Sequence, residues 1–303
     1  HFGEKGIKMK KKKISRFDVV LTIFSLIVLL ITVYPLYFVV IASISEPHLV
    51  STGAVFFVPK GITWEGYQKV LKDSEIWIGY RNTIFYTVAG TLLNLGITLP
   101  AAYALSRKQL AGRKLFIMLI LFTMFFSGGM IPTYILVKGL HLTDTLWALI
   151  LPCAASAYNI VVARTYFENS IPKELEEAAT IDGCSNFKVF FRIVLPLSAP
   201  IVAVMTLFYG ISHWNSYFDG MIYLSDRKLF PLQVILREIL SVAQTASSQT
   251  MSAEDAVTMA EQARIADLVK YVIMIVATAP VMLIYPFVQK YFVKGVMIGS
   301  VKG

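Results

Sequence analysis

The sequence predicts an all-α polytopic membrane protein with six transmembrane helices. Hydrophobic residues make up 56% of the 303 residues and charged residues only 16%, whereas a soluble domain carries about 25% charge. The apolar residues also stand in long blocks. Because a spanning helix needs about 20 apolar residues, each uncharged stretch predicts one crossing; the stretches are 19–45, 82–106, 115–137, 145–163, 193–218 and 271–289.

Basic residues predict the orientation of these helices. Six crossings place both termini, the second connection and the fourth connection on one side of the membrane, and most of the 28 Lys and Arg residues lie there. The positive-inside rule makes this side cytoplasmic. The net charge of +9 is therefore explained by topology, and no nucleic-acid partner is expected.

This topology divides the chain into three parts and predicts a multi-pass membrane protein. The parts are a basic cytoplasmic N-terminus (1–16), a six-helix transmembrane domain (17–291) and a cytoplasmic tail (292–303). Within the domain we expect large outer loops at about 45–78 and 220–268 and a cytoplasmic loop at 167–192. The outer loop 220–268 contains an amphipathic pattern typical of a helix, formed by Leu232, Ile235, Leu236, Ile239 and Leu240.

Several kinds of chemistry are missing from the sequence. Cys153 and Cys184 are far apart, in a span and a cytoplasmic loop, and do not indicate a disulfide framework. No spacing typical of a metal site occurs, and no G-x-x-x-x-G-K-[ST] loop that could hold ATP phosphates. No nucleophile, base and orienting group converge either. We therefore expect a non-enzymatic chain without a bound metal or cofactor.

The cytoplasmic loop contains a short helix with signals at both ends. Pro172 fits the first turn, acidic residues follow near the positive end of the helix dipole, and Gly183 fits the left-handed position that ends a helix. Four residues at i, i+3, i+4 and i+7 are expected to share one narrow face suited to another protein's groove: Leu175, Ala178, Ala179 and Asp182. Pro196 and Pro200 should then bend or break the fifth span near its start.

This loop resembles the EAA loop of ABC importer permeases. That motif has the form E-A-A, three residues, G, nine residues and I-x-L-P. The chain has Glu177-Ala178-Ala179, Gly183 and Ile193-Val194-Leu195-Pro196 at the same spacings. The resemblance implies the type I ABC importer permease fold and a location in the bacterial inner (cytoplasmic) membrane. It also implies that the loop forms the coupling helix, seated in a cleft of an ATPase subunit through Glu177, Ala178, Ala179, Asp182 and Gly183.

Further segments are similar to carbohydrate importer permeases related to the smaller maltose permease. They include 102–107 with 112–113, Trp214-Asn215, 224–226 and 230–232. Segments 126–134 and 146–152 resemble a subfamily associated with acidic plant or algal oligosaccharides, such as aldouronates, rhamnogalacturonan fragments and alginate. The resemblance implies four kinds of partner: a second, larger permease, two ATPase subunits that bind ATP and Mg, an extracytoplasmic solute-binding protein, and the oligosaccharide.

Two groups of residues are candidates for contact with the substrate and the binding protein. Aromatic and amide side chains suit sugars, or they line a helix interface; the candidates are Tyr209, Trp214, Asn215, Tyr217, Tyr158 and Asn159. In the resembling family, the loop at 220–268 reaches into the binding protein. The corresponding candidates for docking are Leu240, Ala243, Gln244, Ser247 and Gln249.

The main alternative is an ion-coupled secondary transporter of small solutes. Such transporters need ionisable residues within the bilayer. The uncharged spans offer His213 alone as a group that titrates near neutral pH, with Asp219 close to the end of the same span.

Overall fold

The computed structural model describes residues 15–246 and 256–300, and its regular elements there are all helical. Three short turns, η1 (Leu146–Leu149), η2 (Phe190–Val194, a π turn) and η3 (Arg227–Leu229), interrupt the α-helices. The α-helices are α1 (Arg16–Ser43), α2 (Pro47–Ser51), α3 (Glu65–Lys72), α4 (Ser74–Ser106), α5 (Arg113–Phe125), α6 (Met130–Gly139), α7 (Ala157–Ser170), α8 (Lys173–Ile181), α9 (Asn186–Val189), α10 (Leu195–Leu197), α11 (Ala199–Trp214), α12 (Tyr217–Tyr223), α13 (Leu232–Ala246) and α14 (Ala256–Ser300).

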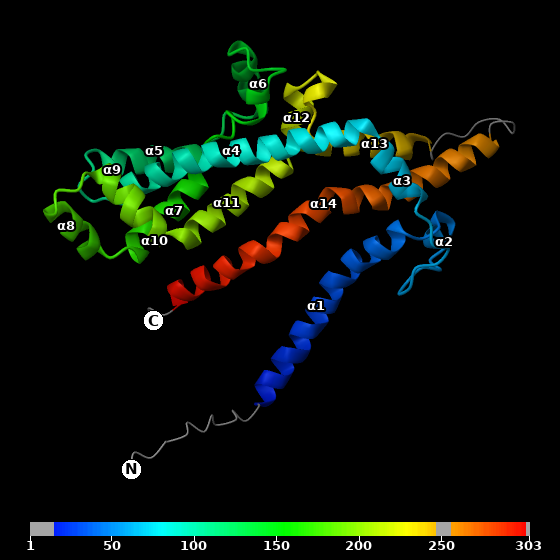
Figure 1. Ribbon diagram of the computed structural model, residues 1–303, viewed down its shortest axis with the longest axis horizontal. Coiled ribbons are helices and arrows are strands. Elements are labelled where there is room, and N and C mark those ends of the chain that lie inside the picture. Colours follow the sequence, from blue (N-terminus) through cyan, green and yellow to red (C-terminus); the bar gives the residue numbers. More distant parts are fainter. Residues whose placement is uncertain (1–14, 247–255, 301–303) are drawn as a thin grey trace.

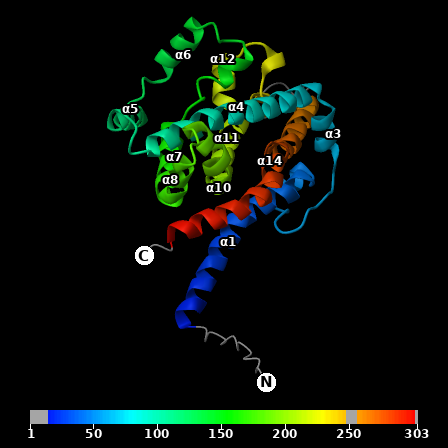
Figure 2. The same ribbon diagram turned by 60° about the vertical axis from the view of Figure 1, so that its left-hand side comes forward.

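The 33-residue helix α4 organises the packing (Figure 1). It packs against α7 and α11 toward its C-terminal end and against α13 toward its N-terminal end. Two clusters of buried apolar side chains lie along it: one joins α4 to α12, α13 and α14, and the other joins it to α7, α8, α9 and α11. Helix α1 packs mainly against α14 and diverges from the remaining helices (Figure 2).

A polar seam runs between α4 and α11. Thr98 and Tyr209 share a hydrogen bond of 2.6 Å between their hydroxyls, and His213 Nε2 lies 2.7 Å from Asn94 Oδ1. The seam is close because Gly90 faces the His213 ring: a Cβ at this glycine would lie 2.4 Å from Nε2. Small residues permit such close approach between membrane helices, and polar side chains bond across it.

Three of the six predicted spans are continuous helices. Helices α1, α4 and α14 are long and apolar enough to cross a membrane. Two further predicted spans correspond to pairs of helices with a sharp bend between them. Helices α5 and α6 meet at 112°, and the segment Asn186–Leu197 meets α11 at 83°. The described residues thus contain three candidate spans, or up to five if each bent pair counts as one. The bend before α11 confirms the effect expected of Pro196 and Pro200.

The fourth predicted span, 145–163, is not a single helix. Turn η1 ends at Leu149, and α7 begins only at Ala157, where Ser156 caps it by accepting a bond from the backbone N–H of Asn159. Pro152 lies in the irregular segment between them. Proline removes a backbone donor and disfavours helical geometry in the residue before it. Composition alone therefore overestimated the helix here.

The seam predicts opposite outcomes for two glycines of α4. We expect Gly90→Ala to lower the stability of the purified permease by about 1–3 kcal/mol, because its Cβ would overlap the His213 ring. Gly96→Ala is the matched control, since a Cβ there meets nothing within 4 Å and alanine favours the helix. Thermal unfolding in detergent measures both. Equal unfolding temperatures for the two variants would contradict the close packing.

Candidate coupling site and transport pathway

Helix α8 is a nine-residue helix whose N-terminal end carries negative charge. Pro172 occupies the N-cap position, and Glu174 and Glu176 lie in the first turn. Carboxylates there interact favourably with the unpaired N–H groups of the helix end. The local sequence therefore stabilises a helix that is too short to be stable alone in water.

The C-terminal end of α8 is closed by a Schellman motif. The Cys184 N–H donates to the Ala179 carbonyl at 2.9 Å, and the Gly183 N–H donates to the Thr180 carbonyl at 3.0 Å. Gly183 has φ +74°, and a Cβ there would meet nothing within 4 Å. Glycine is therefore required for its backbone conformation and not for space. The motif also brings the half-buried Cys184 into the same apolar cluster as Ala179.

An ion pair joins α8 to the end of α4. Arg107 donates from Nη1 to Glu176 Oε2, and its guanidinium lies 4.6 Å from the centre of the Tyr103 ring. Both charged side chains are largely buried, at 20% and 16% exposed. Burial raises the pKa of the Glu176 carboxyl, and the charge of Arg107 opposes that shift. The remaining oxygen, Oε1, is buried without a hydrogen-bond partner among the described residues, so Arg107 is the group that compensates this charge.

A second group of charges fixes the connection between α4 and α5. Glu168, near the end of α7, accepts hydrogen bonds from Arg113 and from Arg164, whose Nη2 lies at 2.9 Å. Arg113 also donates from Nε to the Leu105 carbonyl at 2.7 Å. One carboxylate thus holds the start of α5 against α7, next to the point where Arg107 holds α8.

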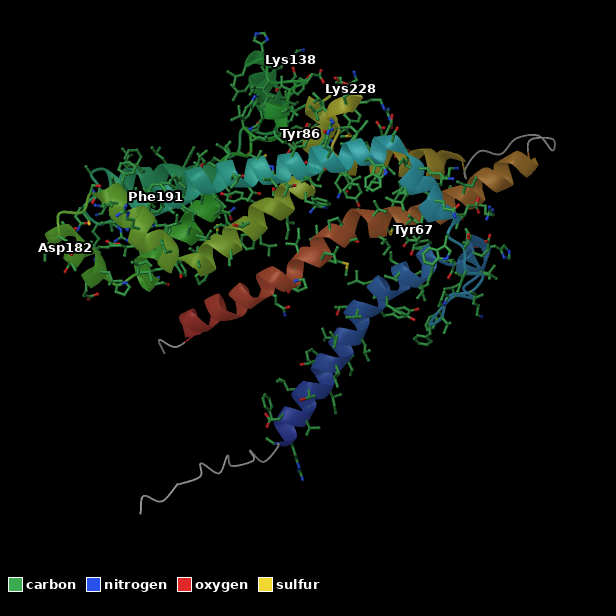
Figure 3. The ribbon with its side chains drawn as sticks, viewed as in Figure 1. Tyr67, Tyr86, Lys138, Asp182, Phe191 and Lys228 are labelled. Atoms are coloured by element: carbon green, nitrogen blue, oxygen red, sulfur yellow. The ribbon has the colours of Figure 1, made fainter. Side chains whose placement is uncertain are left out.

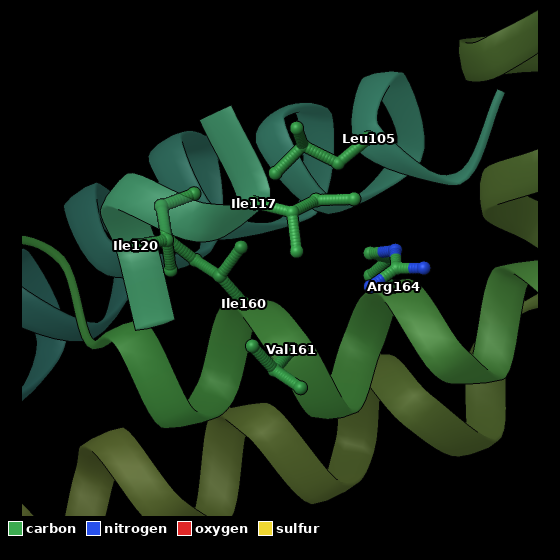
Figure 4. A pocket seen from close by; sticks show the side chains of 6 residues that line it. All are labelled: Leu105, Ile117, Ile120, Ile160, Val161 and Arg164. Atoms are coloured by element: carbon green, nitrogen blue, oxygen red, sulfur yellow. The ribbon is translucent and has the colours of Figure 1, made fainter. Parts of the chain in front are cut away.

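An apolar seam between α5 and α7 lies beside these charges (Figure 4). Ile117 and Ile120 of α5 face Ile160 of α7, and Arg164 lies one turn further along α7. The seam leaves no room for a water molecule. It is therefore a packed contact that supports the loop, and it is too small to hold a sugar.

The predicted contact face of α8 is divided between solvent and the chain's own core. Glu177, Ala178 and Asp182 are exposed, and Asp182 lies at the far end of the molecule (Figure 3). Ala179, however, is only 5% exposed and packs into the second apolar cluster. The predicted face was Leu175, Ala178, Ala179 and Asp182; Leu175 is also exposed, so the expectation that the face points outward is wrong for Ala179 alone. Its small side chain allows α8 to approach the chain's own core, while Ile181 takes the outer side at 87% exposed.

The six candidate pathway residues do not converge. Trp214 is buried and donates from Nε1 to the Ala277 carbonyl at 3.0 Å, and Tyr209 is buried against Thr98. Asn159 is buried at the start of α7. These three lie at helix interfaces, as the alternative interpretation expects.

The other three pathway candidates are accessible. Tyr158 and Asn215 are exposed and Tyr217 is half-buried. Asn215 donates from Nδ2 to the Ile211 carbonyl at 3.0 Å, so its amide oxygen remains available to an external donor. These side chains therefore leave polar atoms at the surface of the chain.

The candidate docking residues lie at the end of α13. The amphipathic pattern predicted there is confirmed, because Leu232, Ile235 and Leu236 are buried against α4 and α14. Leu240 is half-buried, and Ala243 and Gln244 lie in the last turns of the helix. Ser247 and Gln249 lie outside the described residues.

Long apolar helices, two bent helix pairs and a packed interior define a class: the chain is a helical membrane protein. The described residues also contain no group of three or more side chains suited to a metal. The class is narrowed by comparison with known proteins.

The chain belongs to the family of binding-protein-dependent transport system inner membrane components, whose model matches residues 76–298. It is 40% identical over 287 residues to the polygalacturonan/rhamnogalacturonan transport system permease protein YtcP of Bacillus subtilis (strain 168), covering 95% of this chain and 98% of that protein. Protein LplC of the same organism is 39% identical, with 90% of each chain covered.

A solved structure agrees with this assignment. A chain from a bacterial ABC transporter involved in the import of the acidic polysaccharide alginate is 36% identical, with a TM-score of 0.79 over 92% of this chain and 98% of that one. The predicted resemblance is confirmed. The chain is a permease subunit in the cell membrane, and ATP is hydrolysed by a separate subunit. Family membership also favours the importer over the ion-coupled alternative, and His213 is engaged with Asn94.

The sequence did not identify the ion pairs that hold α8 to the end of α4 and the start of α5 to α7. In the sequence, Arg107 and Arg113 lie in a segment similar to carbohydrate importer permeases, and Glu176 is one of several acidic residues in the predicted helix. Their partners are 69 and 55 residues away along the chain. From the sequence, the signal for these ion pairs is that opposite charges lie near the ends of neighbouring helices. Several other pairs of charged residues fit the same signal.

Charge exchange tests the ion pair at α8. We expect Glu176→Arg and Arg107→Glu each to reduce the uptake obtained per ATP hydrolysed, because a buried charge loses its partner at a cost of about 1–3 kcal/mol. The double variant should recover part of the loss. Glu174→Arg is the control, since Glu174 is exposed on the same helix. A double variant as impaired as the sum of its singles would contradict the pairing.

Proposed function

We propose that this chain is one of two permeases of an ABC importer for oligosaccharides derived from acidic polysaccharides. The substrate is delivered by an extracytoplasmic solute-binding protein. The observation that carries the proposal is similarity along nearly the whole chain to two transport proteins named for such substrates, one for polygalacturonan and rhamnogalacturonan and one for alginate. Galacturonate and alginate residues both carry a carboxylate on the sugar ring.

The proposed topology has six crossings with both termini in the cytoplasm. Helices α1, α4 and α14 and the two bent pairs supply five crossings. The segment containing η1 and α7 supplies the sixth as a broken element. Irregular backbone within a membrane is tolerated where protein surrounds it or it lines a water-filled cavity; the irregular segment begins at the buried Ile150, whereas Leu151 and Pro152 are exposed on the single chain. The basic residues around α8 and the α4–α5 connection support a cytoplasmic position for both.

Helix α8 is the proposed coupling helix. Glu177, Ala178 and Asp182 stand on its free side, Ala179 seats it on the chain's own core, and Gly183 closes it. A rigid helix held by Arg107 can be moved as a unit by an ATPase that carries ATP and Mg. Exposed Ile181 adds an apolar contact beside the charged residues.

The substrate pathway is proposed to lie between this chain and a second permease. Tyr158, Asn215 and Tyr217 have accessible side chains that can line it, while Tyr209, Trp214 and Asn159 support the helices behind it. The end of α13 with the following residues is the proposed docking segment for the binding protein. Its residues Leu240, Ala243, Gln244, Ser247 and Gln249 bring no unpaired charge into a sugar cleft.

Uptake by cells with and without this chain tests the substrate class. We expect loss of the chain to abolish uptake of labelled trigalacturonate or an alginate trimer and to leave uptake of neutral maltotriose unchanged. The chain expressed from a plasmid should restore the lost uptake. If the deletion leaves acidic uptake intact, or removes only neutral uptake, the proposed substrate class is wrong.

A charge reversal on the free side of α8 tests the coupling helix. We expect Glu177→Lys to leave the permease in the membrane but to lower uptake at least tenfold, because it reverses the charge on the face of α8 that is proposed to contact the ATPase. Glu174→Lys, one turn earlier, is the control and should retain most uptake. Normal uptake in the Glu177 variant would contradict the assignment, and membrane fractionation shows whether each variant is inserted.

A further inference from the structure

The segment between α2 and α3 carries an apolar tip that no part of the described chain covers. Phe56, Phe57 and Val58 are 56%, 64% and 64% exposed, whereas the neighbouring Val55 is buried. The sequence contains no charge from Leu49 to Pro59. Three adjacent large apolar side chains on a protruding segment are costly in water, so this tip requires an apolar environment.

The tip folds back beside α1. Tyr34 donates its hydroxyl to the Phe56 carbonyl at 3.2 Å, and Tyr37 donates to the Phe57 carbonyl at 2.5 Å. With a rise of 1.5 Å per residue, these tyrosines lie about 14 Å and about 9 Å before Ser43, the last residue of α1. The chain leaves α1, passes through α2 and returns alongside the helix it came from (Figure 1).

The level of the tip relative to a membrane follows from α1. Asp18 is the last charged residue before the uncharged stretch 19–45. About 20 helical residues cross the hydrocarbon core, so the far boundary lies near Phe38. Tyr34 and Tyr37 are therefore just inside that boundary, and the tip bonded to them lies at the same level. Lys60 and Trp64 follow at the end of the segment, where charged and aromatic residues meet headgroups.

The backbone of the tip is adapted to this level. Irregular backbone at membrane depth is tolerated only where its polar groups find partners, and the two tyrosine hydroxyls supply partners for the carbonyls of Phe56 and Phe57. The rings pack as well: Tyr34 and Phe56 have centroids 5.3 Å apart, and Phe56 and Phe57 meet edge to face at 4.6 Å. The tip is thus held against α1, while the side chains of Phe56, Phe57 and Val58 remain more than half exposed.

We propose that residues 54–58 form an interfacial anchor whose Phe56, Phe57 and Val58 insert into the outer-leaflet lipid. Lipid is the occupant because the tip lies at the boundary level, carries no charge and is followed by Lys60 and Trp64, residue types that meet headgroups. The anchor fixes the height of α1, which otherwise packs mainly on α14. The outer position rests on the proposed topology.

A spin label at position 57 tests the anchor in the assembled transporter in lipid nanodiscs. In a Cys153→Ala, Cys184→Ala background, a label on Phe57→Cys should collide more with oxygen than with a water-soluble nickel chelate, giving a positive depth parameter. A label on Ser51→Cys, exposed at the end of α2, should give a negative one. Tyr37→Phe should lower the value at position 57, because the Phe57 carbonyl loses its partner.

Two results would overturn the assignment. A negative depth parameter at position 57 places the tip in water and overturns the proposal. An immobilised label that neither reagent reaches shows that the second permease covers the tip, which also overturns it. Reaction of Ser51→Cys with an impermeant maleimide in intact cells tests the topology separately. Acidic-oligosaccharide uptake by the same variants shows whether the proposed function fails independently of the anchor.

Discussion

The close contact between α4 and α11 is the constraint on which the other elements depend. It is possible only because Gly90 leaves space for the His213 ring, and Asn94 and Thr98 supply hydrogen bonds along the same face. In a chain surrounded by lipid, apolar packing alone distinguishes poorly between helix neighbours, whereas paired polar groups specify them. The two apolar clusters then form along α4, one toward its N-terminal end and one toward its C-terminal end.

Helix α4 also connects the two ends of the molecule. At its N-terminal half, Asn82 donates to the Phe230 carbonyl at 3.0 Å and Tyr86 donates to the Leu229 carbonyl at 2.8 Å, which hold the segment leading into α13. At its C-terminal end, Arg107 holds α8. Under the proposed function, movement of α8 by an ATPase therefore reaches the proposed docking segment through one continuous helix.

The burial of the aromatic residues limits what one permease contributes to the pathway. Trp214 and Tyr209 bond to Ala277 and Thr98 within the chain, so their polar atoms do not serve sugar hydroxyls. The helix pairs that bend between α5 and α6 and before α11 also set the path of the chain, but within the described residues they do not enclose a substrate site. These features agree with the proposed pathway between two permeases and with the proposed role of α8 as the coupling helix.

The sequence by itself determined the helical membrane class, the two ends of α8 and the bend at Pro196 and Pro200, because each depends on composition or on a few adjacent residues. It also predicted the family through a motif of fixed spacing. Only the tertiary structure decided that Ala179 faces inward, that 145–163 is broken and that Glu176 pairs with Arg107. These depend on which distant segments meet, and a hydropathy pattern shows that a side chain is apolar or charged without showing what it contacts.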